Sequence, residues 1–443
     1  MVVTAKVDWP ETARVAAIVG ASGRFLLRMS EPGGAACIWS LGDVAWPGLD
    51  VSSILESWLQ TVELALVPLS RIGQMEGKSG SLVLIGRFWC PTERRPSHPL
   101  VLKSRDKKGK GVSLATEWAN ASAAKPHAYD RKDSFAIPIH FDNADPDYEI
   151  LWSLCMPSVR EIEADRVDLQ GFPEVQDLRT ALAYAGAHDR NHDTTALQAL
   201  RQTYASLRGL HRANANLATG EFEQEERSWT EEYSWYLRSY SASGGGLWGP
   251  EWASVWGDVD EKMTDGKINP IWLVERLRTE HAPLKLGTVH GDLHPGNVLL
   301  RKDDSPAIID FGWSKVRAHV AKDFALMECN LRFLTLPAQV GDLELDQFCS
   351  WLGFADDTPT MSSDRMTGRV QLVSAVRTAA AAVFGDGAEW DQQYLIPLFL
   401  VAFGLLRFAP QLGNQVAARR FVEALANRIG TQLANAAAQS TPS

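Results

Sequence analysis

HGDLHPGN at residues 290–297, followed by IIDFG at residues 308–312, is the stretch of sequence that decides the fold. Each of its three chemically versatile side chains, Asp292, Asn297 and Asp310, lies beside a short apolar run of the β-strand type. We expect the strand before the first loop to pair antiparallel with the strand before Asp310. Such pairing would bring the three polar side chains to one end of the two strands.

These side chains supply the groups that phosphoryl transfer requires. Asn297 offers an amide oxygen and Asp310 a carboxylate, which are hard ligands suited to Mg²⁺. Asp292 is then the remaining carboxylate, able to accept or orient a hydroxyl proton. Because phosphoryl transfer needs in-line positioning, metal ions and such a base, the pattern predicts this chemistry.

The composition is that of a folded protein with more than one domain or lobe. The chain has 443 residues, of which 45% are apolar and 22% charged, and this length exceeds that of one ordinary core. The net charge of −10 argues against a general binder of nucleic acid or anionic membranes. The five cysteines are scattered without CxxC spacing, which favours a reducing, cytoplasmic location.

The chain is also expected to be free of membrane segments. Its first ten residues lack the basic and then apolar pattern of a signal peptide. The longest apolar run, residues 394–406, is interrupted by Pro397 and is too short to cross a bilayer. We interpret this run as a buried core helix.

Three regions follow from the changes in pattern along the chain. Residues 1–66 form a small appendage with a predicted β-hairpin and one helix, and we expect a packing or partner-docking role. Residues 67–156 carry short strands and one helix near 113–123, which predicts an antiparallel sheet with a helix packed on it. Residues 157–443 are mainly helical and contain both polar loops. The predicted fold class is therefore α+β, with a small antiparallel sheet lobe and a large helical lobe.

The two loops resemble the catalytic and metal-binding loops of the aminoglycoside phosphotransferase and choline kinase-like superfamily, relatives of the protein kinases. The resemblance rests on HGDLHPGN and on IDFG at residues 309–312. It implies a two-lobed protein kinase-like fold, Asp292 as the catalytic base, and Asn297 and Asp310 as Mg²⁺ ligands. It also implies that His290 and Asp323 have structural roles.

The same resemblance requires the lobe at 67–156 to bind ATP. Lys103 ends a predicted strand, and Glu117 lies on the one predicted helix of this lobe. We expect an ion pair between them to hold Lys103 on the nucleotide phosphates. The loop containing Gly77, Ser79 and Gly80 precedes a strand, so its backbone amides are candidates to cover those phosphates.

This loop is a poor match to the Walker nucleotide-binding motif. The run GQMEGKS at residues 73–79 is one residue short of that pattern. The residues after it, 82–85, predict a strand where the Walker motif requires a helix. We therefore reject a Walker site.

A closer similarity covers about residues 66–436. DFGWSK at residues 310–315 and HVAKDFALME at residues 319–328, with a long helical C-terminus, resemble the kinase-like ternary-complex-associated domains of bacterial conflict systems. The glycine that follows the metal loop in small-molecule kinases is replaced around Ala318. This departure weakens the transfer of an aminoglycoside or choline substrate to this chain.

For three other groups of residues, we favour a structural or surface role over a binding site. His290 and His294 lack a third zinc ligand, so structural roles are preferred. The acidic residues of 221–232 and the tryptophans near them could form an amine-binding pocket. We favour the alternative that the acidic residues are surface charges and the tryptophans pack in the core. The basic residues of 103–110 are interpreted as a solvated loop.

Two classes of function remain. The first is a kinase that transfers the γ-phosphate of ATP to a hydroxyl of a small molecule or of a co-encoded protein. The second is a kinase-fold regulatory or scaffolding module with little or no turnover. The combination of Lys103, Asp292, Asn297 and Asp310 favours the first, and the appendage at 1–66 keeps the second open. Residues 157–270 are the expected location of acceptor specificity. The sequence predicts neither the acceptor nor the oligomeric state.

Overall fold

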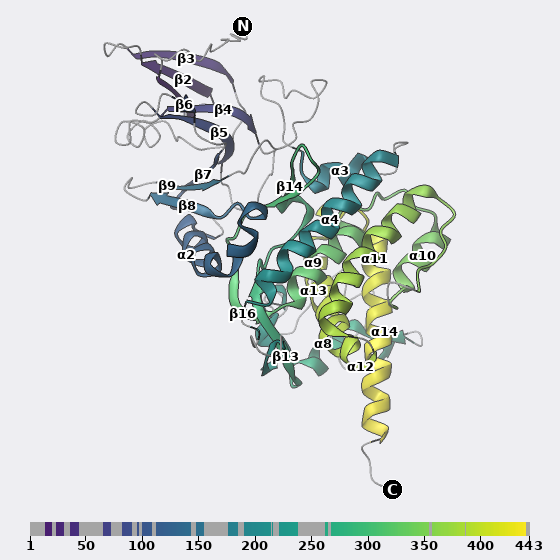
Figure 1. The fold of residues 1–443 in the computed structure, drawn as a ribbon. Coiled ribbons are helices and arrows are strands. Elements are labelled where there is room, and N and C mark those ends of the chain that lie inside the picture. The colour runs from purple at the N-terminus through teal and green to yellow at the C-terminus, as the bar shows by residue number, and fades with distance from the viewer. Residues whose placement is uncertain are drawn as a thin grey trace. The chain divides into compact units, whose positions relative to one another are not determined.

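The fold was obtained as a computed structural model (Figure 1). The structure describes residues 100–108, 112–142, 148–154, 176–184, 190–213, 215, 221–237, 262–264, 267–353, 357–385 and 387–439. It also describes the backbone of earlier strand segments at 14–19, 24–30, 36–43, 65–71, 82–90 and 95–96. The predicted helix of the appendage lies outside the described residues.

The chain divides into two compact units, and each is described by itself. Unit 1 comprises Met1–Asp177 and Val298–Ser314, and unit 2 comprises Leu178–Asn297 and Lys315–Ser443. The short segment Val298–Ser314 therefore belongs to unit 1, although it is flanked on both sides by unit 2 sequence.

Unit 1 is built from antiparallel sheets with one α-helix among its described residues. Its elements are β1 Arg14–Val19, β2 Arg24–Ser30, β3 Ala36–Asp43, β4 Ala65–Arg71, β5 Leu82–Cys90, β6 Arg95–Pro96, β7 Leu100–Asp106, α2 Leu114–Ala124, the 3₁₀ segment η1 Lys125–Ser134, β8 Pro138–Asp142, β9 Tyr148–Leu154, β14 Val298–Leu300 and β15 Pro306–Ile308.

The main sheet of unit 1 has the order β4-β5-β7-β9-β8, with β6 paired to β5. Strand β7 is central, and its Lys103 lies opposite Val83 on β5 and Leu151 on β9. Helix α2 begins after Ser113, whose side chain accepts a hydrogen bond from the backbone N–H of Thr116, as an N-cap residue does. The sheet and helix predicted for residues 67–156 are therefore present.

The predicted hairpin of the appendage is also confirmed. β1 pairs antiparallel with β2, from Arg14 opposite Ser30 to Val19 opposite Phe25. A third strand, β3, pairs with β2 and was not predicted.

Unit 2 is mainly helical. Its elements are α3 Leu178–Tyr184, α4 Arg190–His211, β10 Glu223–Ser228, α5 Trp229–Glu232, β11 Met263–Thr264, β12 Lys267–Ile268, α8 Pro270–Leu277, β13 His281–Val289, the 3₁₀ turn η3 Pro295–Asn297, β16 Lys315–His319, α9 Ala321–Cys329, the π-helical segment η4 Asn330–Leu334, α10 Asp342–Ser350, α11 Asp364–Phe384, α12 Gly387–Trp390, the π-helical segment η5 Asp391–Leu395, α13 Ile396–Leu405, the 3₁₀ segment η6 Leu406–Gln411 and α14 Gln415–Gln439.

In unit 2, α9 packs against α13 and α11, α4 packs against α11 and α3, and α14 packs against α10, α13 and α8 (Figure 1). Every residue of α13 is buried, which confirms the interpretation of residues 394–406 as a core helix. None of the helices in the described part of the chain is both long and apolar enough to cross a bilayer.

A buried charge cluster lies within this helical core. The carboxylate of Glu328 accepts hydrogen bonds from Arg332 Nε at 2.7 Å, from Arg377 Nη2 at 2.7 Å and from the Tyr394 hydroxyl at 2.5 Å. Burial would raise the pKa of Glu328, but the two guanidinium groups hold it below its ordinary value. Because removing one partner of a buried ion pair is strongly destabilising, this cluster fixes how the core helices meet.

The second unit contains a sheet that the sequence did not predict. β13 is its central strand, with β10 on one side and β16 on the other. Strand β10 is the acidic run that we interpreted as surface charge or an amine pocket. It forms one edge of this sheet, and its Glu223 Oε1 is 2.5 Å from Nη2 of Arg317 on β16, the opposite edge strand. Trp229 is core, with 1% of its surface exposed.

One predicted strand pairing is wrong. β13 pairs with β10 and β16, whereas β15 pairs with β14, from Val298 opposite Ile308 to Leu300 opposite Pro306. The chain folds back on itself directly after the first loop, because residues 301–305 make a tight connection with Asp304 at a φ of 63°. The fold class is confirmed as mixed α+β, with small antiparallel sheets and mostly helical content.

Candidate active site

The first polar loop begins where β13 ends. Gly287 on this strand passes so close to the carbonyl of His211, at the end of α4, that a Cβ atom would overlap it. Glycine is therefore required here for β13 to pack against α4. Two residues after the strand, Gly291 has a φ of 83°, a conformation that glycine adopts at little cost. The backbone turns sharply at this point and directs the loop out of the sheet.

A buried carboxylate on α9 holds the backbone of this loop. Asp323 is fully buried, and its Oδ2 accepts from the backbone N–H of His290 at 2.9 Å while Oδ1 accepts from that of Gly291 at 2.8 Å. The ring Nε2 of His211 lies 2.9 Å from Asp323 Oδ2. Burial would raise the pKa of Asp323, but these hydrogen bonds and the charges of the neighbouring histidines hold it below its ordinary value.

The loop itself is closed by Asn297. Its Nδ2 donates to the backbone carbonyl of Asp292 at 2.9 Å, and its backbone N–H donates to the carbonyl of His294 at 2.9 Å. Because the amide nitrogen is committed to this bond, the amide oxygen is the atom of Asn297 with the character of a metal ligand. The side chain of Asp292 is 34% exposed, and its Oδ2 lies 3.8 Å from His294 Nε2.

A second polar cluster lies in unit 1. Lys103 Nζ is 2.7 Å from Glu117 Oε2 and 3.0 Å from Asp310 Oδ2. The side chain of Lys103 is 11% exposed and that of Glu117 is 6% exposed. The ion pair predicted between Lys103 and Glu117 is therefore present, and Asp310 is a second partner that was not predicted.

Burial and charge shift the titration of this cluster. Burial would lower the pKa of Lys103, but the carboxylates of Asp310 and Glu117 raise it well above its ordinary value. Burial raises the pKa of Glu117 to about 7, against the lowering effect of Lys103 and with a further increase from Asp310. Lys103 is therefore a stable cation facing two carboxylates.

Asp310 stands in a strained turn. Its φ is 64°, in the left-handed region that aspartate tolerates better than most side chains. Its Oδ1 accepts from the backbone N–H of Gly312 at 3.3 Å, and the carbonyl of Gly312 accepts from Asn120 Nδ2 on α2 at 2.7 Å. Backbone strain of this kind is often kept at functional sites.

Hydrogen bonds and packing fix this turn to the rest of unit 1. Phe311 is fully buried and meets Phe135 edge to face, with ring centroids 5.9 Å apart. The backbone N–H of Ala136 donates to the carbonyl of Ile308 at 2.8 Å. The β14–β15 hairpin is thus joined to the segment that precedes β8.

Taken one by one, two of the predicted site residues carry oxygens of the kind that Mg²⁺ binds. Asn297 in unit 2 has a neutral amide oxygen, and Asp310 in unit 1 has a carboxylate whose side chain is 34% exposed. Mg²⁺ takes one or two protein oxygens and fills its remaining positions with water and phosphate oxygens. Val298, directly after Asn297, pairs with Ile308, which precedes Asp310 by two residues.

Some predicted site residues lie outside the described part of the chain, and some residues near the site were not predicted. Gly77, Ser79 and Gly80, predicted to cover the phosphates, lie outside the described residues. Asn120 and the partnership of His211 with Asp323 were not predicted as parts of the site. For Asn120 the only available signal was its position one turn after Glu117 on the same predicted helix.

The comparison with family models agrees with the resemblance to ternary-complex-associated domains. Residues 264–407, roughly a third of the chain, match the family model described as ternary complex associated domain 9. No curated protein matches the chain.

The similar solved structures are aminoglycoside phosphotransferases and related kinases. A thermostable mutant of aminoglycoside phosphotransferase APH(4)-Ia, in complex with ADP and hygromycin B, has a TM-score of 0.44 at 9% identity, covering 85% of this chain and 98% of its own. The AMP complex of spectinomycin phosphotransferase APH(9)-Ia has a TM-score of 0.38 at 11% identity, covering 86% and 98%. A microcompartment-associated aminopropanol kinase has a TM-score of 0.38 at 14% identity, covering 87% and 98%.

Proposed function

We propose that the chain is an ATP-dependent phosphotransferase that transfers the γ-phosphate to a hydroxyl group of a small molecule or a partner protein. The observation that carries this proposal is the placement of Lys103 between Glu117 and Asp310, at 2.7 and 3.0 Å. A buried lysine that stays charged beside two carboxylates is suited to meet the phosphates of a nucleotide.

In this proposal Asp292 acts on the acceptor. Its carboxylate accepts the hydroxyl proton and orients the oxygen for attack, because it lies on a loop whose backbone is fixed by Asp323 while the side chain stays partly exposed. A positioned general base contributes about 10²- to 10⁴-fold to such a reaction.

Lys103 and Glu117 act on the nucleotide. Glu117 is anchored on α2, and its contact with Lys103 restricts the rotamers of the lysine, so that the ammonium group is already placed when phosphates arrive. Asn297 and Asp310 are the residues that would hold Mg²⁺, with the side-chain oxygens that such an ion prefers. The bound ion would supply positive charge to the phosphate oxygens, as in related phosphoryl transfer.

A second function has one observation in its favour. The match of residues 264–407 to a ternary complex associated domain supports a module that works within an assembly, with little or no turnover. A kinase requires Asp292 as a general base, whereas an assembly module with little or no turnover does not.

The experiment compares wild type with Asp292→Asn, which keeps the shape of the side chain and removes its basicity. Calorimetry measures ATP binding with and without Mg²⁺, and labelled ATP measures transfer to a panel of hydroxyl acceptors and to the chain itself. We expect turnover to fall by about 10²- to 10⁴-fold, with Mg²⁺-dependent ATP binding changed less than about twofold.

The exposed aspartate Asp303, on the β14–β15 connection, gives the matched control Asp303→Asn, which should retain full turnover. ATP binding without turnover in wild type would favour the assembly module instead. Absence of ATP binding would refute the nucleotide site itself.

A further inference from the structure

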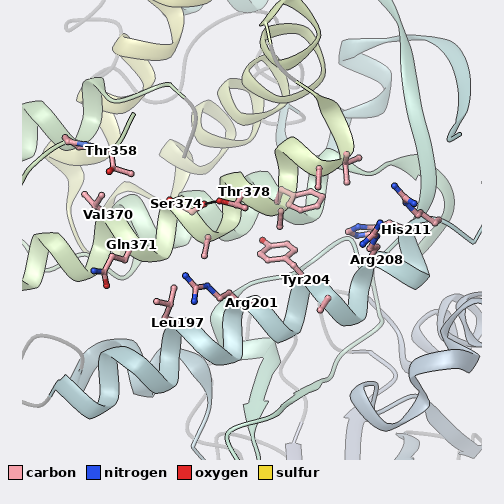
Figure 2. A pocket seen from close by; sticks show the side chains of 18 of the residues that line it. Leu197, Arg201, Tyr204, Arg208, His211, Thr358, Val370, Gln371, Ser374 and Thr378 are labelled. Atoms are coloured by element: carbon pink, nitrogen blue, oxygen red, sulfur yellow. Dashed lines mark hydrogen bonds between the residues drawn. The ribbon is translucent and has the colours of Figure 1, made fainter. Parts of the chain in front are cut away.

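A groove lies between α4 and α11 within unit 2, apart from the residues assigned to phosphate transfer. Its volume is about 760 Å³, and its lining includes neither Asp292 nor Asn297. Figure 2 shows Arg201 and Tyr204 reaching into it from α4, with Ser374 and Thr378 on the opposite wall. A volume of this size falls within the range of roughly 300–1,000 Å³ typical of small-molecule sites.

The floor of the groove is apolar and aromatic. Tyr204 is 5% exposed and Phe324 is 2% exposed. Their rings stack with centroids 4.8 Å apart and planes within 4° of parallel. Val370 on α11, 5% exposed, also belongs to the lining. A flat or extended apolar group placed here would be desolvated against these side chains.

The rim of the groove is cationic. Arg201, Arg208 and Arg212 line it, and no aspartate or glutamate is among the lining residues. Arg201 and Arg208 are exposed, so their guanidinium groups meet solvent. Arg208, in the last turn of α4, and Arg212, directly after the helix, are four residues apart, a spacing at which like charges repel on a helix. An anion near them would relieve that repulsion.

Arg212 marks the polar end of the groove. Its guanidinium group lies over the ring of Phe222, 5.7 Å from the centroid. Its Nε is screened from solvent and, among the described residues, has no hydrogen-bond partner. A buried donor left unpaired costs free energy. Arg212 itself is half-buried and adds a positive charge to the lining at this end.

We propose that this groove binds a small organic anion, in which a carboxylate or phosphate head meets the arginines and an apolar body lies on Tyr204, Phe324 and Val370. Arginine pairs with both kinds of head through two parallel N–H donors. The proposal does not depend on phosphotransferase activity, because the lining contains none of Lys103, Glu117, Asp292, Asn297 and Asp310, and shares with the anchored loop only His211, the partner of Asp323.

The test measures binding of defined probes to the full chain by calorimetry. Decanoate and decyl phosphate present the two heads on the same apolar body. Decyltrimethylammonium reverses the charge, and inorganic phosphate lacks the body. We expect saturable binding of at least one decyl anion, at least tenfold tighter than that of the cation and of inorganic phosphate.

Two variants locate the site. Arg201→Gln with Arg208→Gln should weaken binding of the decyl anion at least tenfold. The matched control changes two other exposed arginines of unit 2, Arg276→Gln with Arg419→Gln, and should leave the affinity within about twofold. Ala379→Phe, which fills the groove from α11, should abolish binding while circular dichroism and the unfolding midpoint verify that the chain is folded.

Several outcomes would overturn the proposal. They are the absence of saturable binding of both decyl anions, equal binding of decyltrimethylammonium, and an equal loss of affinity in the control pair. Undiminished binding by folded Ala379→Phe would also place the anion elsewhere. If inorganic phosphate bound as tightly as decyl phosphate, the apolar floor would have no part in recognition.

Discussion

The two polar clusters of the candidate site are held in place by different means. In unit 1, Lys103, Glu117 and Asp310 hold one another through side-chain ion pairs. In unit 2, the carboxylate of Asp323 holds the loop that carries Asp292 through the backbone N–H groups of His290 and Gly291.

The difference matches the work that we propose for each cluster. When a nucleotide or a metal ion binds, a phosphate oxygen can replace a carboxylate beside the lysine, and a metal ion can replace the lysine beside a carboxylate. Each group then keeps an oppositely charged partner. A base must keep its position whether or not substrate is present, so anchoring through the backbone suits it. Removing one of these contacts at a time should therefore have effects of different size, and the buried anchor should matter most.

Loss of the buried anchor should be the most damaging change. Asp323→Ala leaves the N–H groups of His290 and Gly291 and the ring of His211 without their acceptor. We expect the free energy of unfolding of unit 2 to fall by about 3–5 kcal/mol, as when one partner of a buried pair is removed. Urea unfolding followed by circular dichroism measures this loss. Asp364→Ala, at an exposed site of unit 2, should cost far less, and equal costs would contradict the anchoring role.

Removal of the central cation of unit 1 should have a smaller effect that depends on pH. Lys103→Met leaves Glu117 and Asp310 facing each other, at a cost of about 2 kcal/mol near pH 8, because Asp310 is partly exposed and hydrogen bonds to charged groups contribute about 1.5–3 kcal/mol. The pKa of Glu117 is already raised to about 7, and loss of Lys103 should raise it further.

The direction of this pH dependence follows from proton binding to Glu117. A carboxyl group whose folded pKa exceeds its unfolded value stabilises the fold at low pH, and this contribution is lost as the pH rises through the folded pKa. The deficit of Lys103→Met relative to wild type should therefore shrink from pH 8 to pH 5. Thermal unfolding across this range measures it. A deficit independent of pH would exclude Glu117 as the responding group.

A buried histidine beside the central strand of unit 2 should make that unit sensitive to acid. His319 Nε2 faces Gln393 Oε1 at 3.2 Å, and Nδ1 faces the Tyr233 hydroxyl at 2.8 Å. Gln393 Oε1 can only accept, so Nε2 carries the proton and Nδ1 accepts. Burial lowers the pKa of His319 to about 3.

Because the unfolded histidine titrates near its ordinary pKa, the stability contributed by neutral His319 is present above about pH 6.5 and is lost as the pH falls toward 3. Wild type should lose about 1 kcal/mol more per pH unit than His319→Gln between pH 6 and 4. Urea unfolding at several pH values measures both slopes. Identical slopes would show that His319 is not the group that binds the extra proton.

The smallest effect is expected from a single hydrogen bond of the metal-loop turn. Asn120→Ala removes the donor to the Gly312 carbonyl, at a cost of about 0.5–1.5 kcal/mol. Because this bond joins α2 to the turn of Asp310, Mg²⁺-dependent ATP binding should weaken as well. Asn120→Asp, which keeps the size but cannot donate when ionised, should behave like the alanine variant. Retention of wild-type ATP affinity in both would separate this bond from the site.

Local sequence patterns were sufficient to predict much of the fold. The mainly helical pattern of residues 157–443 predicted the region that contains α4, α11 and α14, and the glutamate on the predicted helix after Lys103 identified its ion-pair partner. These predictions succeeded because the relevant periodicity or spacing lies within one element. The assigned roles of Asp292, Asn297 and Asp310 are still predictions.

Features set by distant parts of the chain were missed. β10 is rich in glutamate and lacks the apolar alternation of a strand, because its half-buried Glu223 and Glu225 pair with Arg317. The pairing of β14 with β15 involves strands of three residues, too short to show a period. His211 and Asp323 are 112 residues apart, and no local pattern joins them.

The assignment of Val298–Ser314 to unit 1 has a consequence for the order of synthesis. Met1–Asp177 is translated first, but Asp310, the second partner of Lys103, and Ile308, the hydrogen-bond partner of Ala136, are translated only after more than a hundred residues of unit 2. Unit 1 therefore cannot finish folding on the ribosome before most of the first half of unit 2 has been made. A nascent chain arrested between residues 178 and 297 would hold Lys103 and Glu117 without the turn that completes their cluster.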